Sequence, residues 1–174
     1  MRFIKFGLSS VVILFLIITA ISALIPSSTT VTRTIDINAP FDSVYNSINN
    51  LAEWHRWMDN MDSAKCNIAD KAMGNGAKMI IEYPNNTHKT SVEIVESTST
   101  NVKTVWRVND SKPLTGDFYS MSKPGVPVTL QWQFVQKVKW YPWQKFSLIF
   151  SDKAFGPFME RSLDSLKQQL QQPG

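Results

Sequence analysis

The chain has 174 residues, of which 43% are hydrophobic and 18% are charged. This is enough apolar material for one well-packed domain, and the chain is too short for two. Setting aside Arg2 and Lys5 leaves 16 basic and 14 acidic residues, so the net charge of +4 falls to +2 and gives no reason to expect a nucleic-acid partner. Cys66 is the only cysteine, which excludes an internal disulfide and a structural zinc site.

The first segment predicts a membrane anchor. Residues 6–25 carry no charge and follow two basic residues; at 1.5 Å per residue they span about 30 Å, the thickness of a bilayer core. We expect residues 1–25 to be an uncleaved anchor and the domain to lie on the extracytoplasmic (periplasmic) side. A cleaved signal peptide is the alternative, because residues 20–22 (AIS) resemble a cleavage site. Residues 26–30 (PSSTT) form a short polar tether in this interpretation.

The domain itself opens with a strand and two short helices. Residues 31–37 alternate between apolar and polar side chains, which is typical of a strand. Residues 41–49 then have apolar side chains at helical spacing, with Asp42 near the start. Residues 51–57 predict a second short helix, whose Trp54 and Trp57 share one face and can plug one end of a small barrel.

From residue 65 onward the apolar period changes to two, which predicts six further strands. Turns are marked by the Gly74-Asn75-Gly76, Pro84-Asn85-Asn86 and Thr98-Ser99-Thr100 segments, and connections this short favour antiparallel neighbours. The expected strands are residues 65–69, 77–83, 87–97, 101–109, 112–121 and 126–139.

A single long helix with a bend is expected over residues 142–171. Its second half carries an apolar stripe at spacings of three and four residues. The pair Gly156-Pro157 interrupts this pattern, because proline removes one hydrogen bond and its ring clashes with the carbonyl four residues back. We therefore expect a kink near residues 154–157.

Two groups of residues carry a resemblance to a known family. The opening reads RTIDINAP at residues 33–40, followed by Val44-Tyr45 and WHRW at 54–57; the ending reads TLQW at 129–132 and SLDSLK at 162–167. Together with the Gly74-x-Gly76 pair, these resemble the START-like (SRPBCC, helix-grip) superfamily, in its polyketide cyclase/dehydrase-type branch. Ser162 departs from that branch, where glycine is usual, and is expected to loosen the packing of the helix on the sheet.

The resemblance implies an α+β fold, a curved seven-stranded antiparallel sheet that grips the C-terminal helix, over residues 31–172. An apolar cavity is implied between sheet and helix. The superfamily contains lipid and sterol carriers, receptors and cyclases, so the fold alone does not imply one activity.

Catalytic candidates are few. His55 and His88 lie far apart in the predicted fold, and Cys66 is either a low-pKa thiol beside Lys65 or a small buried apolar residue. Glu93 and Asp110 could point into the cavity as acid or base, although solvated faces explain most strand carboxylates. The sequence has no zinc-type spacing and no phosphate-cradling loop, so we expect neither catalytic residues, nor a metal, nor a cofactor.

Aromatic and methionine side chains are the stronger signal, since wide, flexible apolar groups suit an adaptable pocket. A filled core is the alternative explanation. Arg107 could meet a ligand carboxylate or phosphate, but its phase is opposite to that of Trp106, so only one of the two faces inward. The residues predicted to line the cavity are Trp106, Tyr119, Met121, Trp132, Phe134, Phe150, Phe155, Met159 and Leu163.

Three functions are compatible with this pattern. The first is a membrane-anchored binding or carrier protein for a hydrophobic small molecule or lipid. The second is an enzyme of the cyclase/dehydrase type that uses an inward carboxylate or Tyr119. The third is a module that binds a protein partner at the membrane surface, which an exposed apolar patch near the tether would favour.

Overall fold

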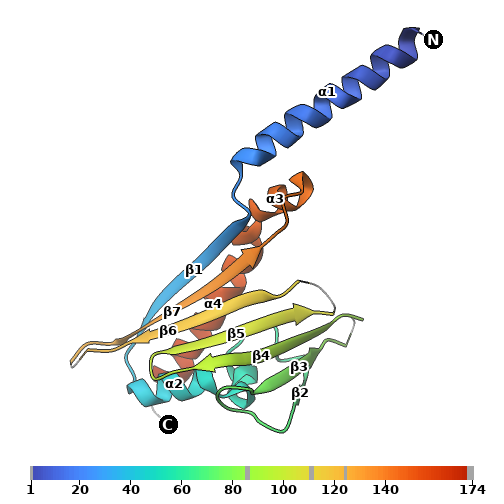
Figure 1. The fold of residues 1–174 in the computed structure, drawn as a ribbon. Coiled ribbons are helices and arrows are strands. Elements are labelled where there is room, and N and C mark those ends of the chain that lie inside the picture. The colour runs from blue at the N-terminus through green and yellow to red at the C-terminus, as the bar shows by residue number, and fades with distance from the viewer. Residues whose placement is uncertain (1, 85–86, 110–111, 124, 172–174) are drawn as a thin grey trace.

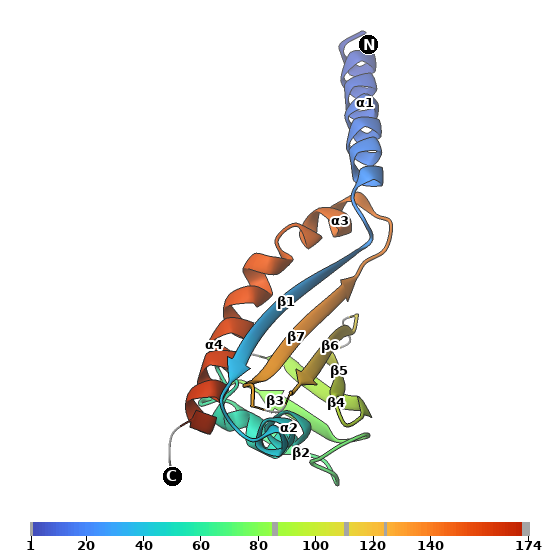
Figure 2. The same cartoon turned by 90° about the vertical axis from the view of Figure 1, so that its left-hand side faces the viewer.

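The computed structural model describes residues 2–84, 87–109, 112–123 and 125–171. A seven-stranded sheet with strand order β1-β7-β6-β5-β4-β3-β2 forms most of the domain, and every neighbouring pair is antiparallel. The sheet curves around one long helix, α4 (Ser151–Gln171), which packs along β1 (Figure 1; Figure 2). The strands are β1 (Ser28–Ile37), β2 (Lys65–Ile68), β3 (Lys78–Glu82), β4 (Lys89–Ser97), β5 (Asn101–Val108), β6 (Leu114–Met121) and β7 (Val128–Lys137).

Four shorter or separate helical elements complete the fold. Helix α1 (Arg2–Leu24) projects away from the domain at the start of β1, while α2 (Phe41–Asn49) and the 3₁₀ helix η1 (Leu51–Arg56) follow β1. Helix α3 (Pro142–Leu148) lies between β7 and α4. This arrangement confirms the predicted helix-grip architecture with an apolar N-terminal helix.

Strand β1 begins three residues earlier than expected. Ser28 pairs with Lys137 of β7, and the amide of Val138 donates a hydrogen bond to the carbonyl of Ser27 at 2.9 Å. Residues 28–30, expected in the tether, therefore belong to the sheet, because two threonines in this stretch suit a strand and β7 supplies the backbone partners. Only residues 25–27 separate α1 from β1.

The C-terminal helix is divided in two, and the break is not at the expected place. Helix α3 ends where the amides of Ile149 and Phe150 bond to carbonyls three residues back, a tight 3₁₀ turn. Helix α4 then starts at Ser151 and runs through Pro157, so the expected single helix over residues 142–171 is wrong, while the kink expected at residues 154–157 stays a prediction. The direction changes because α3 packs against α1 whereas α4 packs against β1.

An aromatic cluster fills the interior at the α2 end of the sheet. Trp54 and Trp57 are fully buried, and each indole N–H donates to a backbone carbonyl of α2, at 3.1 and 3.3 Å. Phe118 stacks on Trp132 with ring centroids 4.7 Å apart, and both contact Trp57. Aromatic pairs of this kind contribute about 0.5–1.5 kcal/mol each beyond their burial. The predicted plug of the barrel end is present.

Polar contacts hold both halves of α4 in place. Arg33 of β1 crosses the helix over Gly156 and forms ion pairs with Asp152 at 2.9 Å and Glu160 at 2.6 Å. A side chain at Gly156 would meet the Arg33 guanidinium, so glycine leaves room for Arg33 in this position, and a larger residue would require the arginine side chain to shift. The hydrogen bonds that Arg33 donates to Asp152 and Glu160 raise the pKa of its guanidinium, which stays charged.

Ser162, the departure from the family pattern, has a bonding role that sequence reasoning missed. Its hydroxyl accepts a hydrogen bond from the Asp59 amide at 2.9 Å and donates to the Phe158 carbonyl at 2.8 Å. Arg161 forms two hydrogen bonds to the Asp59 carboxylate nearby. These contacts tie α4 to the loop after η1, so the serine adds a link between the two elements.

Gly116 of β6 leaves space for two of the large rings. A Cβ atom there would lie 2.7 Å from the Thr104 hydroxyl oxygen, 3.0 Å from the Phe134 ring and 3.1 Å from the Trp106 indole nitrogen. Thr104 is fully buried, with its hydroxyl bonded to the Gly116 carbonyl and to the Trp106 N–H, so it has little freedom to move.

We predict that Gly116→Ala lowers the free energy of unfolding by about 1–3 kcal/mol, the usual cost of overpacking a core. Urea denaturation followed by circular dichroism measures this. Thr115→Val, a shape-conserving change at the neighbouring, half-buried position, is the control and should change stability by less than about 0.5 kcal/mol. Equal stability of Gly116→Ala and the wild type would contradict the packing described here.

Candidate ligand-binding site

A cleft of about 640 Å³ lies between the sheet and the start of α4, at the end of the domain nearest α3. We call it the helix–sheet cleft. Strands β5, β6 and β7 provide one wall, and helix α4 provides the other. Its described lining consists of Thr90, Trp106, Val108, Lys112, Pro113, Leu114, Phe134, Gln136, Lys137, Val138, Gln144, Ala154, Phe155 and Phe158.

Aromatic rings form the floor and the helix wall of the cleft. Phe134 lies 5.6 Å from Trp106 and 5.5 Å from Phe155, measured between ring centroids. Leu114 lies opposite Trp106 in the β5–β6 register and extends the same apolar surface. Trp106 is held in orientation by its N–H, which donates to the Thr104 hydroxyl at 2.9 Å. The result is a preformed apolar surface at which a ligand displaces water.

Polar and basic side chains surround the apolar part. Lys112 Nζ donates to the Gln144 side-chain oxygen at 3.0 Å, and the same oxygen accepts from the Lys139 amide at 3.0 Å. Lys137 also lines the cleft, and Gln136 accepts a hydrogen bond from Ser151. Among the described lining residues lysine is the only ionisable type, so the charge of this lining is positive.

Three of the nine predicted cavity residues line this cleft, namely Trp106, Phe134 and Phe155. Three more, Trp132, Met159 and Leu163, are at most 2% exposed and pack in the interior beyond it. Phe150 is 65% exposed and lies in the turn between α3 and α4.

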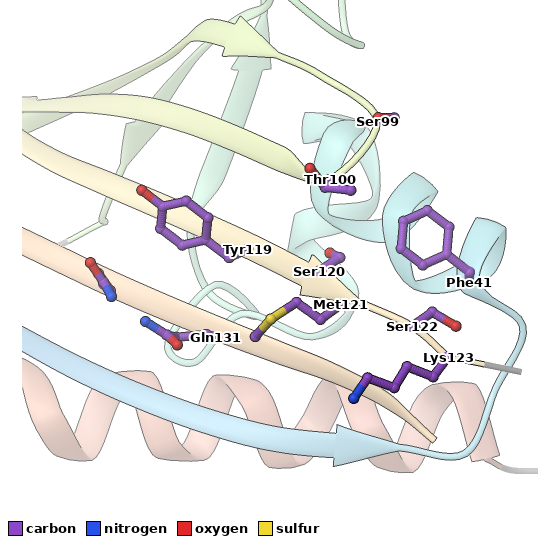
Figure 3. Close-up of a pocket in the computed structure, with 10 residues that line it drawn as sticks. Phe41, Ser99, Thr100, Tyr119, Ser120, Met121, Ser122, Lys123 and Gln131 are labelled. Carbon is purple, nitrogen blue, oxygen red and sulfur yellow. The ribbon is translucent and has the colours of Figure 1, made fainter. Parts of the chain in front are cut away.

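Tyr119 and Met121 lie on the opposite face of the sheet. They line an open hollow of about 930 Å³ together with Phe41, Gln131 and Gln133 (Figure 3). Cross-strand register explains this placement: Phe118 pairs with Trp132 on the α4 side, so its neighbour Tyr119 pairs with Gln131 on the outer side. Tyr119 therefore does not share a cavity with Trp106 and Phe134.

Leu114 and Phe158 line the cleft but were absent from the predicted set. Alternation along β6, which places Leu114, Gly116 and Phe118 on one face, is the signal that identifies Leu114 once the position of Phe118 is known. Phe158 lies on the apolar stripe of α4, and its ring centroid lies 5.6 Å from that of Trp132.

The other candidate groups are distributed over the surface. Arg107 faces outward, where its guanidinium lies 4.0 Å from Glu93, so Trp106 is the inward member of that pair. Glu93 also pairs with Lys78 at 3.2 Å on the outer face, and does not point into the cleft. Asp110 lies outside the described residues.

Neither Cys66 nor the two histidines have the surroundings of a catalytic residue. Burial raises the pKa of the Cys66 thiol, which keeps it protonated at neutral pH, so a low-pKa thiol at this position is wrong. His55 bonds to the Ala52 carbonyl at 2.7 Å, and His88 to the Asn109 side chain at 2.6 Å. Among the described residues no group of three His, Cys, Asp or Glu side chains could hold a metal ion.

Asp117 is a buried carboxylate that sequence reasoning missed. It lies on β6, between the positions of Thr115 and Tyr119 on the outer face, and is 7% exposed. Burial raises its pKa, and the Lys103 ammonium, 3.9 Å away, only partly opposes this. Its Oδ1 atom has no hydrogen-bond partner among the described residues.

A curved antiparallel sheet around a C-terminal helix, with an apolar cleft between them, defines a helix-grip protein. The chain belongs to the polyketide cyclase/dehydrase and lipid transport family, whose model matches residues 28–171. The matched range begins with β1 and ends with α4, so it covers the whole domain and excludes α1. A search of the curated proteins finds none whose sequence matches this chain.

Solved structures of the same fold come from several organisms. Truncated norcoclaurine synthase from Thalictrum flavum has a TM-score of 0.65 and 11% identity, over 84% of this chain and 96% of that chain. A protein from Chromobacterium violaceum has a TM-score of 0.59 and 13% identity, over 83% and 98%. A hypothetical protein from Helicobacter pylori has a TM-score of 0.61 and 12% identity, over 82% and 88%. Likeness at this level of identity shows the fold alone.

We predict that Asp117→Asn raises the melting temperature at pH 7. Folding raises the pKa of this carboxyl group, so the protonated form is more stable in the folded state than the charged form is. The stability of the wild type therefore falls as pH rises and the group loses its proton. The difference between variant and wild type should shrink as pH falls through the raised pKa towards about 4, the ordinary value for aspartate, and should be absent below it. Thermal unfolding at several pH values tests this, with Asp164→Asn on the exposed side of α4 as the control for charge removal. A lower melting temperature at pH 7 would show that the contact with Lys103 outweighs the burial.

Proposed function

We propose that this protein is a membrane-anchored binding or carrier protein that holds a lipid-like molecule in the helix–sheet cleft. The observation that carries the proposal is the combination of an aromatic-walled cleft of about 640 Å³ with lysines in its lining. Small-molecule sites usually have volumes of about 300–1,000 Å³, mostly apolar walls and a few placed polar groups. The description of the family, which includes lipid transport, supports the same class of ligand.

The apolar walls suit a hydrocarbon chain or ring system. Each methylene group transferred from water to such a surface contributes about 0.8 kcal/mol before the entropic costs of binding. Phe155 and Phe158 come from α4 while Trp106 and Phe134 come from the sheet, so a ligand between them contacts both elements of the grip.

The basic lining favours an acidic head group. Lys112 and Lys137 flank the apolar walls, and no described residue of the lining carries a negative charge. A carboxylate or phosphate placed there gains charge-assisted hydrogen bonds, while the attached apolar part lies against the rings. We therefore propose an amphipathic, anionic ligand such as a fatty acid or a lipid phosphate.

Anchoring in a membrane is the second part of the proposal. Residues Phe6–Leu24 of α1 have a mean hydropathy of 2.5, long and apolar enough to cross a bilayer, and only 6% of them are buried against the protein. A signal sequence has the same properties, so the anchor stays a proposal, as does the extracytoplasmic side that Arg2 and Lys5 favour.

Binding fits the cleft better than cyclase chemistry does. Acid–base catalysis needs a titratable group within hydrogen-bond reach of the substrate, and commonly a second that orients it. The ionisable side chains among the described residues of the lining are Lys112 and Lys137, and no histidine, cysteine, aspartate or glutamate is present there to orient a lysine or share a proton with it. Tyr119, the acid or base considered from the sequence, lies on the other face of the sheet.

A photoreactive fatty acid tests the proposal on the full chain in nanodiscs. After irradiation, digestion and mass spectrometry, we expect labelled peptides that contain Trp106, Phe134 or Phe155. Ala154→Trp, which places a ring at the exposed edge of the cleft, should reduce this labelling at least tenfold.

Gln168→Trp is the matched control, because it adds the same ring at an exposed position of α4 away from the cleft. This variant should be labelled by the fatty acid to the same extent as the wild type. Labelling confined to α1, which any bilayer helix would acquire, would contradict the proposed binding site.

A further inference from the structure

A group of large apolar side chains is exposed around α3. Trp140, Trp143, Ile149 and Phe150 are between 62% and 66% exposed. Together with Tyr141 we call them the α3 aromatic segment. Exposed apolar groups of this size, gathered on one short stretch, mark an interaction surface.

Contacts within the protein already hold the α3 aromatic segment in one conformation. Tyr141 stacks on Trp143 with an interplanar angle of 4° and ring centroids 5.0 Å apart, and the ring of Trp140 also lies 5.0 Å from that of Tyr141. Gln144 accepts a hydrogen bond from the Lys139 amide, which closes the turn that leads into α3. Little conformational entropy is therefore left to lose when the rings are covered.

Its position is fixed beside the end of α1. Because β1 pairs with β7, Ser27 just before β1 bonds to Val138 just after β7. Lys145 of α3, which is 8% exposed, donates a hydrogen bond from Nζ to the Ser22 carbonyl of α1 at 3.1 Å. Both views show α3 at the foot of α1 (Figure 1; Figure 2).

The apolar surface of α1 continues towards this segment. Ile21 and Leu24, in the last turn of α1, are 49% and 86% exposed. A bilayer that covers α1 would end at about this level, where tryptophan and tyrosine are the side chains enriched in membrane proteins. The aromatic rings thus lie at the depth of the lipid head groups.

The charges near the segment favour an anionic surface. Residues 137–153 contain four lysines and one acidic residue, Asp152, which is paired with Arg33. Lysines 137, 139 and 153 are exposed. Basic residues next to an apolar interfacial stretch attract acidic lipids.

We propose that the α3 aromatic segment is a membrane-docking element that inserts among the head groups of an anionic bilayer and holds the mouth of the helix–sheet cleft against the lipid. The second half of this statement rests on the proposed function. Three lining residues of the cleft link it to the segment: Lys137 and Val138 precede the segment in the chain, and Gln144 lies within it. A lipid-like molecule can then pass between bilayer and cleft without crossing bulk water.

Tryptophan quenching by brominated lipids tests the docking. Trp54, Trp57 and Trp132 are at most 1% exposed and α1 contains no tryptophan, so a bromine atom in the bilayer reaches Trp140 and Trp143. Trp106 is open to a lipid bound in the cleft, so every protein of this test, including the reference called wild type, carries Trp106→Phe. The full chain is placed in nanodiscs of phosphatidylcholine and phosphatidylglycerol with or without brominated acyl chains. We expect quenching of the wild type that is absent in Trp140→Phe/Trp143→Phe.

A second pair of variants distinguishes insertion of the segment into the bilayer from simple proximity of the tryptophans to it. Ile149→Ser/Phe150→Ser removes apolar neighbours but keeps both tryptophans, and should reduce the quenching at least twofold. Ile80→Ser/Val95→Ser removes two exposed aliphatic side chains from β3 and β4 instead, and should leave quenching unchanged.

Equal emission of the wild type in brominated and unbrominated nanodiscs would overturn the proposal and leave a protein partner as the occupant of the segment. This result is independent of the proposed function. If quenching is absent but fatty acid still labels the cleft, only the docking proposal is contradicted. If quenching is present but the cleft is not labelled, only the proposed ligand site is contradicted.

Discussion

The antiparallel pairing of β1 with β7 is the constraint on which the rest of the structure depends. Ten residue pairs, from Ser28–Lys137 to Ile37–Val128, join the first strand of the domain to the last. The pairing brings the end of α1 to the point where the chain leaves the sheet for α3, and it supplies the strand on which α4 packs. The candidate membrane helix, the exposed aromatic rings and the edge of the cleft therefore meet at one end of the domain.

The space between the sheet and α4 is filled differently at its two ends. Towards α2, Trp54 of η1 and Trp57 just after it pack against Phe118, and Trp57 also packs against Trp132, so this end has a solid core. Towards α3 no corresponding plug exists among the described residues, so Trp106, Phe134 and Phe155 remain as walls of a cleft. A filled core and a cavity, which are alternatives at the level of the sequence, thus occupy opposite ends of the same fold.

Sequence pattern predicted the strands and α2 closely, because a period of two or 3.6 is a local property of each segment. Which face a strand turns inward depends on register with its neighbours. Tyr119 and Met121, predicted to line one cavity with Trp106, therefore lie on the other face of the sheet, and Trp132 lies on the α4 side but packs in the interior beyond the cleft. The division between α3 and α4 was missed for a similar reason: it arises where the packing partner changes from α1 to β1. Asp117 and the bonding role of Ser162 likewise depend on contacts from other elements.

The central claim is that the cleft at the α1 end of the domain holds one lipid-like molecule. Native mass spectrometry of the full chain, released gently from its membrane, tests it most directly. We expect one bound lipid-sized mass per chain in the wild type, lost on organic extraction and absent from Ala154→Trp. A bare polypeptide, or bound lipid that is equally abundant in Ala154→Trp, would contradict it, since lipid of the second kind surrounds α1 without occupying the cleft.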